Sequence, residues 1–446
     1  MAKALLILFG GRIIPNVLTI LHIKPQIIVP IVSKDELEKL DAFKEGLDDL
    51  LQKEKHSYEW LDSKSGEPFV INAHNQGDIK QICKEVVHNN KDKDDKGDAR
   101  DYEWTFNITS GTSIMSIAAY EAAKELKEEG TSISCWYLNT ARRRVEVLVG
   151  EPRNSLQDEA LFRISIKQYA TVHNKVLEIN SRENTLPPEN ERLEFVNFLI
   201  ASPSYIRVLS KLLVEKNKAD PSVESVHYQI SRQNKEQGYY TCKRPLDGDE
   251  KAVLKETQNC SLIQDLTQTN NFLSFKISSQ QFQFLNGGWL ELYVQNEVAN
   301  IKENGQPLFQ DIGRNRHVYN KTGQDYNHQE ENELDVSMIY NAQLFIVECK
   351  AGSDAKKSET IFKLDSVANA FGGGFVGKYL VTALPKDEVI KVEKDRQKEG
   401  NKPETEKSNL EERLEIRKIR LITLDEFKDL KAIFRKEAEN PQYPRT

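Results

Sequence analysis

Glu348 and Lys350 are the first candidates for catalytic residues, because they are charged side chains within the otherwise apolar run LFIVECK. Side chains alternate across a strand, so residues two apart point to the same face. A two-residue turn at Asn341-Ala342 folds the preceding run, ELDVSMIY, back on this strand and brings Asp335 directly opposite Glu348, with Cβ atoms roughly 4.5–5.5 Å apart. Two carboxylates this close repel each other unless a cation lies between them. The pattern therefore predicts a cation site.

The spacing of these oxygen ligands suits Mg²⁺ or Mn²⁺, which need few protein carboxylates. Glu291 is a candidate third carboxylate, because the run GGWLELYVQNEV predicts a helix just before the hairpin. Lys350 is no metal ligand, but it can orient water or offset charge on a phosphate. The predicted chemistry is in-line attack of water on a phosphodiester.

A simpler interpretation of the same residues is a cross-strand salt bridge on a solvated face. Against it, the run LFIV before Glu348 indicates a central strand, and buried strands rarely keep unpaired charge without a purpose. Basic residues around the hairpin are candidate guides for a phosphate backbone. They are Arg314, Arg316, Lys321, Lys356, Lys357 and Lys363.

The elements that must position these residues fall into two α/β segments. In the first 150 residues, strand and helix patterns alternate, which predicts a doubly wound, Rossmann-like domain with a mostly parallel sheet. Its expected strands are KALLILF, QIIVPIVS, PFVINAH, WTFNIT, SISCWYL and VEVLVG. From FLSFKI onward the α/β pattern returns, with helices predicted at SETIFKLDSVANAF and LDEFKDLKAIF.

Between these segments the sequence predicts helices, broken at Ser202-Pro203. We therefore expect three domains: residues 1–152, a helical connector at 153–270, and a second α/β domain at 271–446. A length of 446 residues agrees with two or three domains.

Composition limits the function further. The formal net charge is −7 and the mean hydropathy is −0.60, which argue against a nucleic-acid-coating or membrane protein. The N-terminal run MAKALLILFGG is too short for a signal peptide, so we expect a soluble, cytoplasmic protein. The five cysteines lack CxxC spacing, which argues against a zinc site or a disulfide framework.

Two loops of the first domain carry further residues of interest. Gly10, Gly11 and Arg12 follow the first strand, and Ser110, Gly111 and Thr112 lead from the fourth strand into a helix N-terminus, where backbone N–H groups favour anions. In a doubly wound sheet both loops lie at the carboxyl ends of neighbouring strands, where ligands bind. Such a pocket suits phosphates, although GG and SG are also ordinary turn residues.

The C-terminal pattern of Glu291, Asp335 and Glu348-Cys349-Lys350 resembles the PD-(D/E)xK core of restriction-endonuclease-like nucleases, with Leu334 in place of the usual proline. The resemblance implies that Glu291, Asp335, Glu348 and the Cys349 carbonyl hold the metal, and that Lys350 is the catalytic cation.

The N-terminal half resembles a CARF domain, on the loops LILFGGRIIPN and FNITSGTSIMS. In order of parts, the chain is similar to the CARF-nuclease effectors of type III CRISPR systems. This resemblance implies an antiviral homodimer that binds cyclic tetra-adenylate as its activator. It also implies cleavage of single-stranded DNA or RNA, and nicking of duplex DNA, with Mn²⁺ or Mg²⁺.

Two rival hypotheses stay open. One is an unregulated DNA endonuclease whose N-terminal half only dimerises or holds a mononucleotide. The other is a nucleotide-responsive DNA-binding regulator with a structural, non-catalytic C-terminal domain. Ligand-dependent cleavage argues against the first rival, and metal-dependent cleavage argues against the second.

Overall fold

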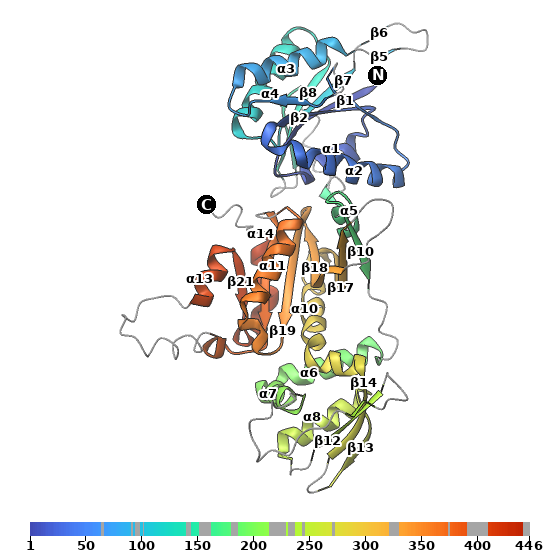
Figure 1. Ribbon diagram of the computed structural model, residues 1–446, viewed down its shortest axis with the longest axis vertical. Coiled ribbons are helices and arrows are strands. Elements are labelled where there is room, and N and C mark those ends of the chain that lie inside the picture. Colours follow the sequence, from blue (N-terminus) through green and yellow to red (C-terminus); the bar gives the residue numbers. More distant parts are fainter. Residues whose placement is uncertain are drawn as a thin grey trace, which may run out of the picture.

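The chain forms three lobes stacked along its longest axis in a computed structural model (Figure 1). The N-terminal residues form one end, the C-terminal residues form the middle, and a central stretch of the sequence forms the other end. Residues 1–439 are described, apart from 64–66, 91, 94–98, 101, 140–143, 151–161, 180–185, 214–228, 231–236, 243–245, 270–272, 321–329, 373–374 and 390–408.

The N-terminal lobe is built on a seven-stranded sheet in the order β3-β2-β1-β7-β8-β9, with β4 also paired to β2. All these neighbours are parallel except β8 and β9. The strands are β1 (Lys3–Phe9), β2 (Ile27–Ser33), β3 (Glu59–Trp60), β4 (Phe69–Ile71), β7 (Glu103–Asn107), β8 (Ile133–Asn139) and β9 (Arg144–Val149); a separate hairpin holds β5 (Asp92–Lys93) and β6 (Ala99–Arg100).

Helices cover both faces of this sheet, which confirms the doubly wound prediction. Alternate residues of β1 explain why: Leu5, Ile7 and Phe9 pack into one core, and Ala4, Leu6 and Leu8 pack into the other. One face carries α1 (Ile14–Ile23) and α2 (Leu37–Lys53), and the opposite face carries α3 (Gln76–Asn89) and α4 (Ser113–Glu128).

The middle lobe contains a mixed six-stranded sheet in the order β10-β17-β18-β19-β20-β21. Pairs from β10 to β19 are antiparallel, and β19, β20 and β21 are parallel. The strands are β10 (Lys175–Ile179), β17 (Gln310–Asn320), β18 (Glu330–Tyr340), β19 (Gln343–Lys350), β20 (Gly377–Thr382) and β21 (Ile419–Ile422); a small hairpin, β15 (Lys302–Glu303) and β16 (Gln306–Pro307), precedes them.

Helices again cover both faces of the middle sheet. Apolar residues of α10 (Trp289–Ala299) and α14 (Leu430–Glu439) share one core with Val347 of β19. The other face packs against α5 (Ile166–Thr171), α11 (Ser358–Ala370) and α13 (Asn409–Ile416). The α/β class expected for the C-terminal segment is confirmed. None of the helices in the described part of the chain is long and apolar enough to cross a membrane.

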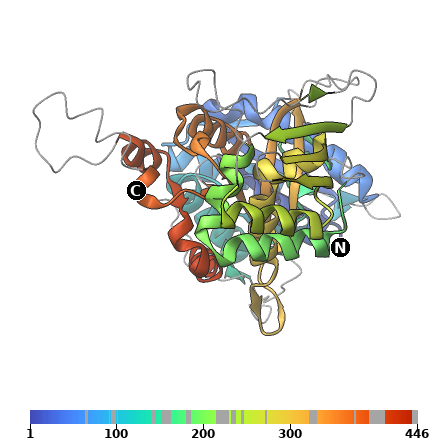
Figure 2. The same cartoon turned by 90° about the horizontal axis from the view of Figure 1, so that it is seen from below.

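The third lobe contains both helices and a four-stranded sheet, β11-β12-β14-β13 (Figure 2). Its helices include α6 and α7, which meet at Ser202 and Pro203 as the sequence predicted. Its elements are α6 (Glu189–Ala201), α7 (Pro203–Leu213), β11 (Gln229–Ile230), β12 (Gln237–Cys242), α8 (Gly248–Asn259), β13 (Gln264–Gln268), β14 (Leu273–Ser278) and α9 (Ser279–Gln283). The expected domain limits, 1–152, 153–270 and 271–446, stay predictions.

Candidate active site and ligand-binding loops

The hairpin of β18 and β19 has the register that the sequence predicted. Its two turn residues, Asn341 and Ala342, have positive φ angles of 51° and 58°, which is typical of a type I′ turn. Paired residues run from Tyr340 opposite Gln343 to Val336 opposite Val347. Asp335 and Glu348 are the next residues along the two strands.

The Asp335 side chain takes the place of a backbone hydrogen-bond acceptor for the neighbouring strand, β19. The Cys349 N–H donates to Asp335 Oδ2 at 2.7 Å. A continuing antiparallel ladder would give this amide a backbone carbonyl instead. The carboxylate therefore satisfies a buried donor and is fixed in place next to the last paired residues of the hairpin, Val336 and Val347.

Lys350 joins the two carboxylates. Its Nζ lies 2.6 Å from Glu348 Oε1 and 3.1 Å from Asp335 Oδ2. Asp335 and Glu348 are only 5% and 2% exposed, so both are buried acids. As expected from strand alternation, the acid and the base of ECK meet on one face. The predicted proximity of Asp335, Glu348 and Lys350 is thus observed, and the divalent cation expected between the carboxylates stays a prediction.

Burial governs the protonation of this cluster. Burial, with the neighbouring Asp335 carboxylate, raises the pKa of Glu348 above its ordinary value, and Lys350 and Lys363 oppose that rise. Burial alone lowers the pKa of Lys350, but the carboxylates Asp335 and Glu348 outweigh it and raise this pKa. Lys350 therefore stays charged at neutral pH.

Glu291 lies in the first turn of α10, as predicted, and within electrostatic range of the hairpin. Burial raises the pKa of Glu291 to about 8, and the nearby Asp335 and Glu333 carboxylates contribute to the rise. Arg314 and Lys350 oppose it. Sequence reasoning missed Glu333, although its position two residues before Asp335 on β18 places both on one face.

The carboxylate oxygens of Asp335 and Glu348 are the type of ligand atom that a hard divalent cation prefers. No group of three or more His, Cys, Asp or Glu side chains able to hold a metal occurs among the residues described. In this structure the Lys350 ammonium pairs with both the Asp335 and the Glu348 carboxylate. The assignments of Asp335, Glu348, Glu291 and the Cys349 carbonyl as metal ligands stay predictions.

Among the basic residues proposed as phosphate guides, the structure brings only some to this site. Lys363, on α11, has its Nζ 3.4 Å from Glu348 Oε1. Arg316 is buried and paired with Asp311 at 2.7 Å, which gives it a structural role. Lys357 pairs with Asp354, whereas Lys321 lies outside the described residues.

The two loops of the N-terminal lobe lie side by side, because β1 and β7 are parallel neighbours. A Cβ on Gly10 would lie 2.5 Å from the Ser110 carbonyl oxygen, and a Cβ on Gly111 would lie 2.8 Å from Leu8 Cδ1. Only glycine permits these close approaches, of Gly10 to the Ser110 backbone and of Gly111 to the Leu8 side chain. The structure thus brings the two predicted loops together at the carboxyl ends of their strands.

A buried polar network anchors these loops and was not predicted. The Asn107 side-chain amide donates to Asn16 Oδ1 at 2.9 Å and to Thr19 Oγ1 at 3.1 Å. Thr109 donates from both its backbone N–H and its hydroxyl to Asn107 Oδ1. Asn16 and Asn107 are fully buried. Polar residues directly after apolar strands were the only indication of this network in the sequence.

Some of the predicted ligand residues already form hydrogen bonds within the protein, and others have polar groups that do not. The Thr112 hydroxyl caps α4 by accepting from the Met115 N–H at 3.2 Å. The buried Ser110 hydroxyl has no hydrogen-bond partner among the described residues. Arg12 lies with its guanidinium carbon 4.1 Å from the centre of the Phe375 ring, and burial lowers its pKa. The Ser110 hydroxyl and the Arg12 guanidinium are thus the two groups of these loops whose chemistry suits an anion.

Comparisons with known proteins agree with this architecture. The Card1 CARF domain model matches residues 5–169, and the Card1-like endonuclease domain model matches residues 278–420. Protein VC1899 from Vibrio cholerae is 20% identical with a TM-score of 0.65, over 98% of this chain and 99% of that chain. Can2 from Sulfobacillus thermosulfidooxidans, solved in complex with cyclic tetra-adenylate, is 18% identical with a TM-score of 0.62, over 98% of each chain.

At these identities the two solved structures show a shared fold. No significant match was found among curated proteins. The two family models match the two lobes that carry the ligand loops and the carboxylate cluster, in that order along the chain. The chain therefore contains a CARF domain like that of Card1, followed by a Card1-like endonuclease domain.

Proposed function

We propose that this chain is a divalent-metal-dependent nuclease that a cyclic oligoadenylate activates in the antiviral defence of a type III CRISPR system. The observation that carries the proposal is the Lys350 ammonium held between two buried carboxylates, Asp335 and Glu348. Cyclic tetra-adenylate is the proposed activator, because Can2 was solved with this molecule and has the same fold.

In this proposal Asp335, Glu348 and the Cys349 carbonyl hold Mn²⁺ or Mg²⁺, with Glu291 as a further carboxylate. When bound, the metal supplies Lewis-acid stabilisation of the charge that develops on the phosphate. The Lys350 ammonium, which reaches both carboxylates, would offset the charge that grows on the scissile phosphate.

The proposed substrates are single-stranded DNA, single-stranded RNA or both, with nicking of duplex DNA. We also propose a cytoplasmic homodimer that binds one activator across its two-fold axis. Differential affinity of the activator for the active arrangement then shifts the population toward cleavage.

A panel assay tests the proposal. Purified protein is incubated with manganese, labelled single-stranded DNA or RNA, and cyclic oligoadenylates of several ring sizes. We expect cleavage that requires both metal and activator. Cleavage that ignores every activator contradicts the regulation, and absence of cleavage combined with binding to duplex DNA supports the regulator hypothesis instead.

The Gly111→Val variant separates the two halves of the proposal. The added side chain collides with Leu8, so we expect activator affinity to fall by about 100-fold or more, while metal binding at the endonuclease domain is kept. Calorimetry with cyclic tetra-adenylate measures the first effect. Gly248→Ala, in open space at the start of α8, is the matched control. Wild-type activator affinity in Gly111→Val contradicts the assignment of this loop.

A further inference from the structure

A cavity of about 330 Å³ lies where the CARF and endonuclease domains meet. Its CARF side includes Gly11 and Arg12 from one predicted ligand loop and Thr109 from the strand end beside the other. Its endonuclease side includes the turn residues Asn341 and Ala342 of the candidate catalytic hairpin. Ligand-loop residues and the hairpin therefore border the same space.

Arg12, from the CARF domain, contacts the endonuclease domain through one face of its guanidinium. The guanidinium carbon lies 4.1 Å from the centre of the Phe375 ring, which belongs to the endonuclease domain. A guanidinium stacks on an aromatic ring through its face and donates hydrogen bonds through its edge. The same side chain can therefore bind a phosphate and keep its contact with Phe375.

The segment around Phe375 is linked to the candidate active site. It follows α11, which ends beside Phe371, and the Phe371 carbonyl accepts from the Tyr169 hydroxyl at 3.3 Å. The same helix carries Lys363, whose Nζ contacts Glu348 at 3.4 Å. Phe371, directly after α11, and Phe375 line the same cavity, so the C-terminal end of this helix borders the space that Arg12 faces.

Among the described residues that line the cavity, Arg12 is the positively charged side chain at neutral pH. His173 also lines the cavity, stacked on Tyr169 at a ring separation of 5.0 Å. Burial lowers the pKa of His173 to about 4, so this imidazole is neutral at neutral pH. A phosphate approaching the described cavity wall therefore meets Arg12 as its charged partner.

We propose that the Arg12–Phe375 contact is the joint through which the CARF domain reports ligand binding to the endonuclease domain. A phosphate bound at the edge of Arg12 fixes the guanidinium, and its face then positions Phe375, α11 and Lys363 beside Glu348. This inference rests on the proposed function and adds its route of regulation. Phe375 is a positioning residue and touches neither metal nor substrate.

The test compares Phe375→Leu, which keeps apolar volume without a π face, with Phe375→Tyr, which keeps the ring. Phe362 provides the matched control, because it lies on α11 and stacks with Arg417 at 4.4 Å, on the exposed surface. Each variant is assayed for cyclic tetra-adenylate affinity by calorimetry and for manganese-dependent cleavage with and without this activator.

We expect Phe375→Leu to bind the activator within about threefold of wild type and to lose about tenfold or more of the activated cleavage rate. Without activator it should show no more cleavage than wild type does. Phe375→Tyr should regain the activated rate, and Phe362→Leu and Phe362→Tyr should behave as wild type.

Three results overturn the inference while leaving the proposed function intact: wild-type activation of Phe375→Leu, an equal loss of affinity and activation, or a raised rate without activator. A wild-type protein that no activator stimulates overturns the proposed function itself, and the inference with it. A second test uses the wild-type protein alone. The rate of backbone hydrogen exchange in α11 should fall on activator binding, and an unchanged rate contradicts the proposal.

Discussion

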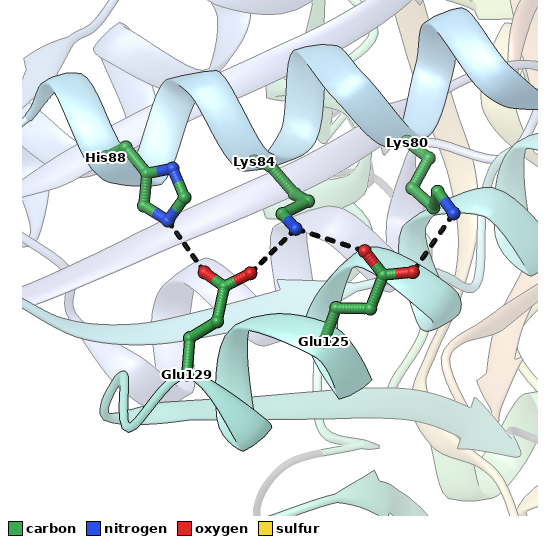
Figure 3. Close-up of polar contacts among 5 residues, drawn as sticks. All are labelled: Lys80, Lys84, His88, Glu125 and Glu129. Atoms are coloured by element: carbon green, nitrogen blue, oxygen red, sulfur yellow. Dashed lines mark hydrogen bonds and ion pairs between the residues drawn. The ribbon is translucent and has the colours of Figure 1, made fainter.

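The CARF and endonuclease domains use the same residue types in opposite ways. On the CARF surface, Lys80, Lys84 and His88 of α3 face Glu125 of α4 and Glu129, the residue after this helix, in a row of contacts at distances of 2.7 to 3.0 Å (Figure 3). Hydrogen bonds from the lysines lower the pKa of both glutamates. These pairs hold two helices together and favour the charged form.

In the endonuclease domain, Glu348 also has two lysines, yet its pKa is raised. The difference is burial: the Glu348 side chain is 3% exposed and that of Glu125 is 40% exposed. Water stabilises the exposed carboxylate in addition to its lysines, whereas the buried one shares its site with Asp335. Ion pairing is common to the two regions, and burial beside a second carboxylate is what distinguishes Glu348 from Glu125.

The largest expected effect comes from removing the buried acid. Glu348→Gln should lower metal-dependent cleavage on the order of 1,000-fold, because a neutral amide cannot replace a carboxylate ligand. Cyclic tetra-adenylate affinity should be unchanged. Glu125→Gln is the control from the exposed row. Wild-type cleavage by Glu348→Gln removes the assigned site.

The next effect concerns the cation of the cluster. Lys350→Met leaves the buried Asp335 without its ammonium partner and Glu348 with Lys363 alone, so we expect a loss of about 3 kcal/mol in the free energy of unfolding without metal. Added manganese should recover part of it. Chemical denaturation at pH 8, with Lys84→Met as the exposed counterpart, measures both effects. Equal losses in the two variants would show that burial does not distinguish the two regions.

A smaller effect is expected in the pH dependence. The folded protein raises the pKa of Glu291 from 4.5 to about 8, so it holds this proton more tightly than the unfolded chain does. The resulting stabilisation is complete below about pH 4.5 and is lost as the pH rises through 8. Glu291→Gln should therefore gain stability relative to wild type between pH 5 and pH 9. Thermal unfolding curves that stay parallel across this range contradict the shift.

The smallest effect belongs to the exposed row. Lys84→Met removes pairs that water and salt already weaken, so we expect a slight fall in melting temperature that disappears in high salt. Cleavage and activator binding should not change. A large, salt-independent loss of stability would mean that the row is as important to the fold as the buried cluster.

The features that the sequence predicted correctly depend on residues close together in the chain, and those it missed depend on residues far apart in the chain. Strand alternation and a two-residue turn are local, so the register that places Asp335 beside Glu348 was predicted correctly. The Asn16–Asn107 network and the Arg12–Phe375 contact join residues far apart in the chain, and no local pattern indicates such pairs. Lys363 was proposed as a phosphate guide, but its contact with Glu348 depends on how α11 packs on the sheet.

The central claim is that the buried carboxylates hold a divalent cation. Titration with manganese, followed by electron paramagnetic resonance of the free ion, tests it most directly in wild type and Glu348→Gln. The account predicts manganese binding by wild type, and affinity at least about 100-fold weaker in the variant. Equal binding by the two proteins would contradict it.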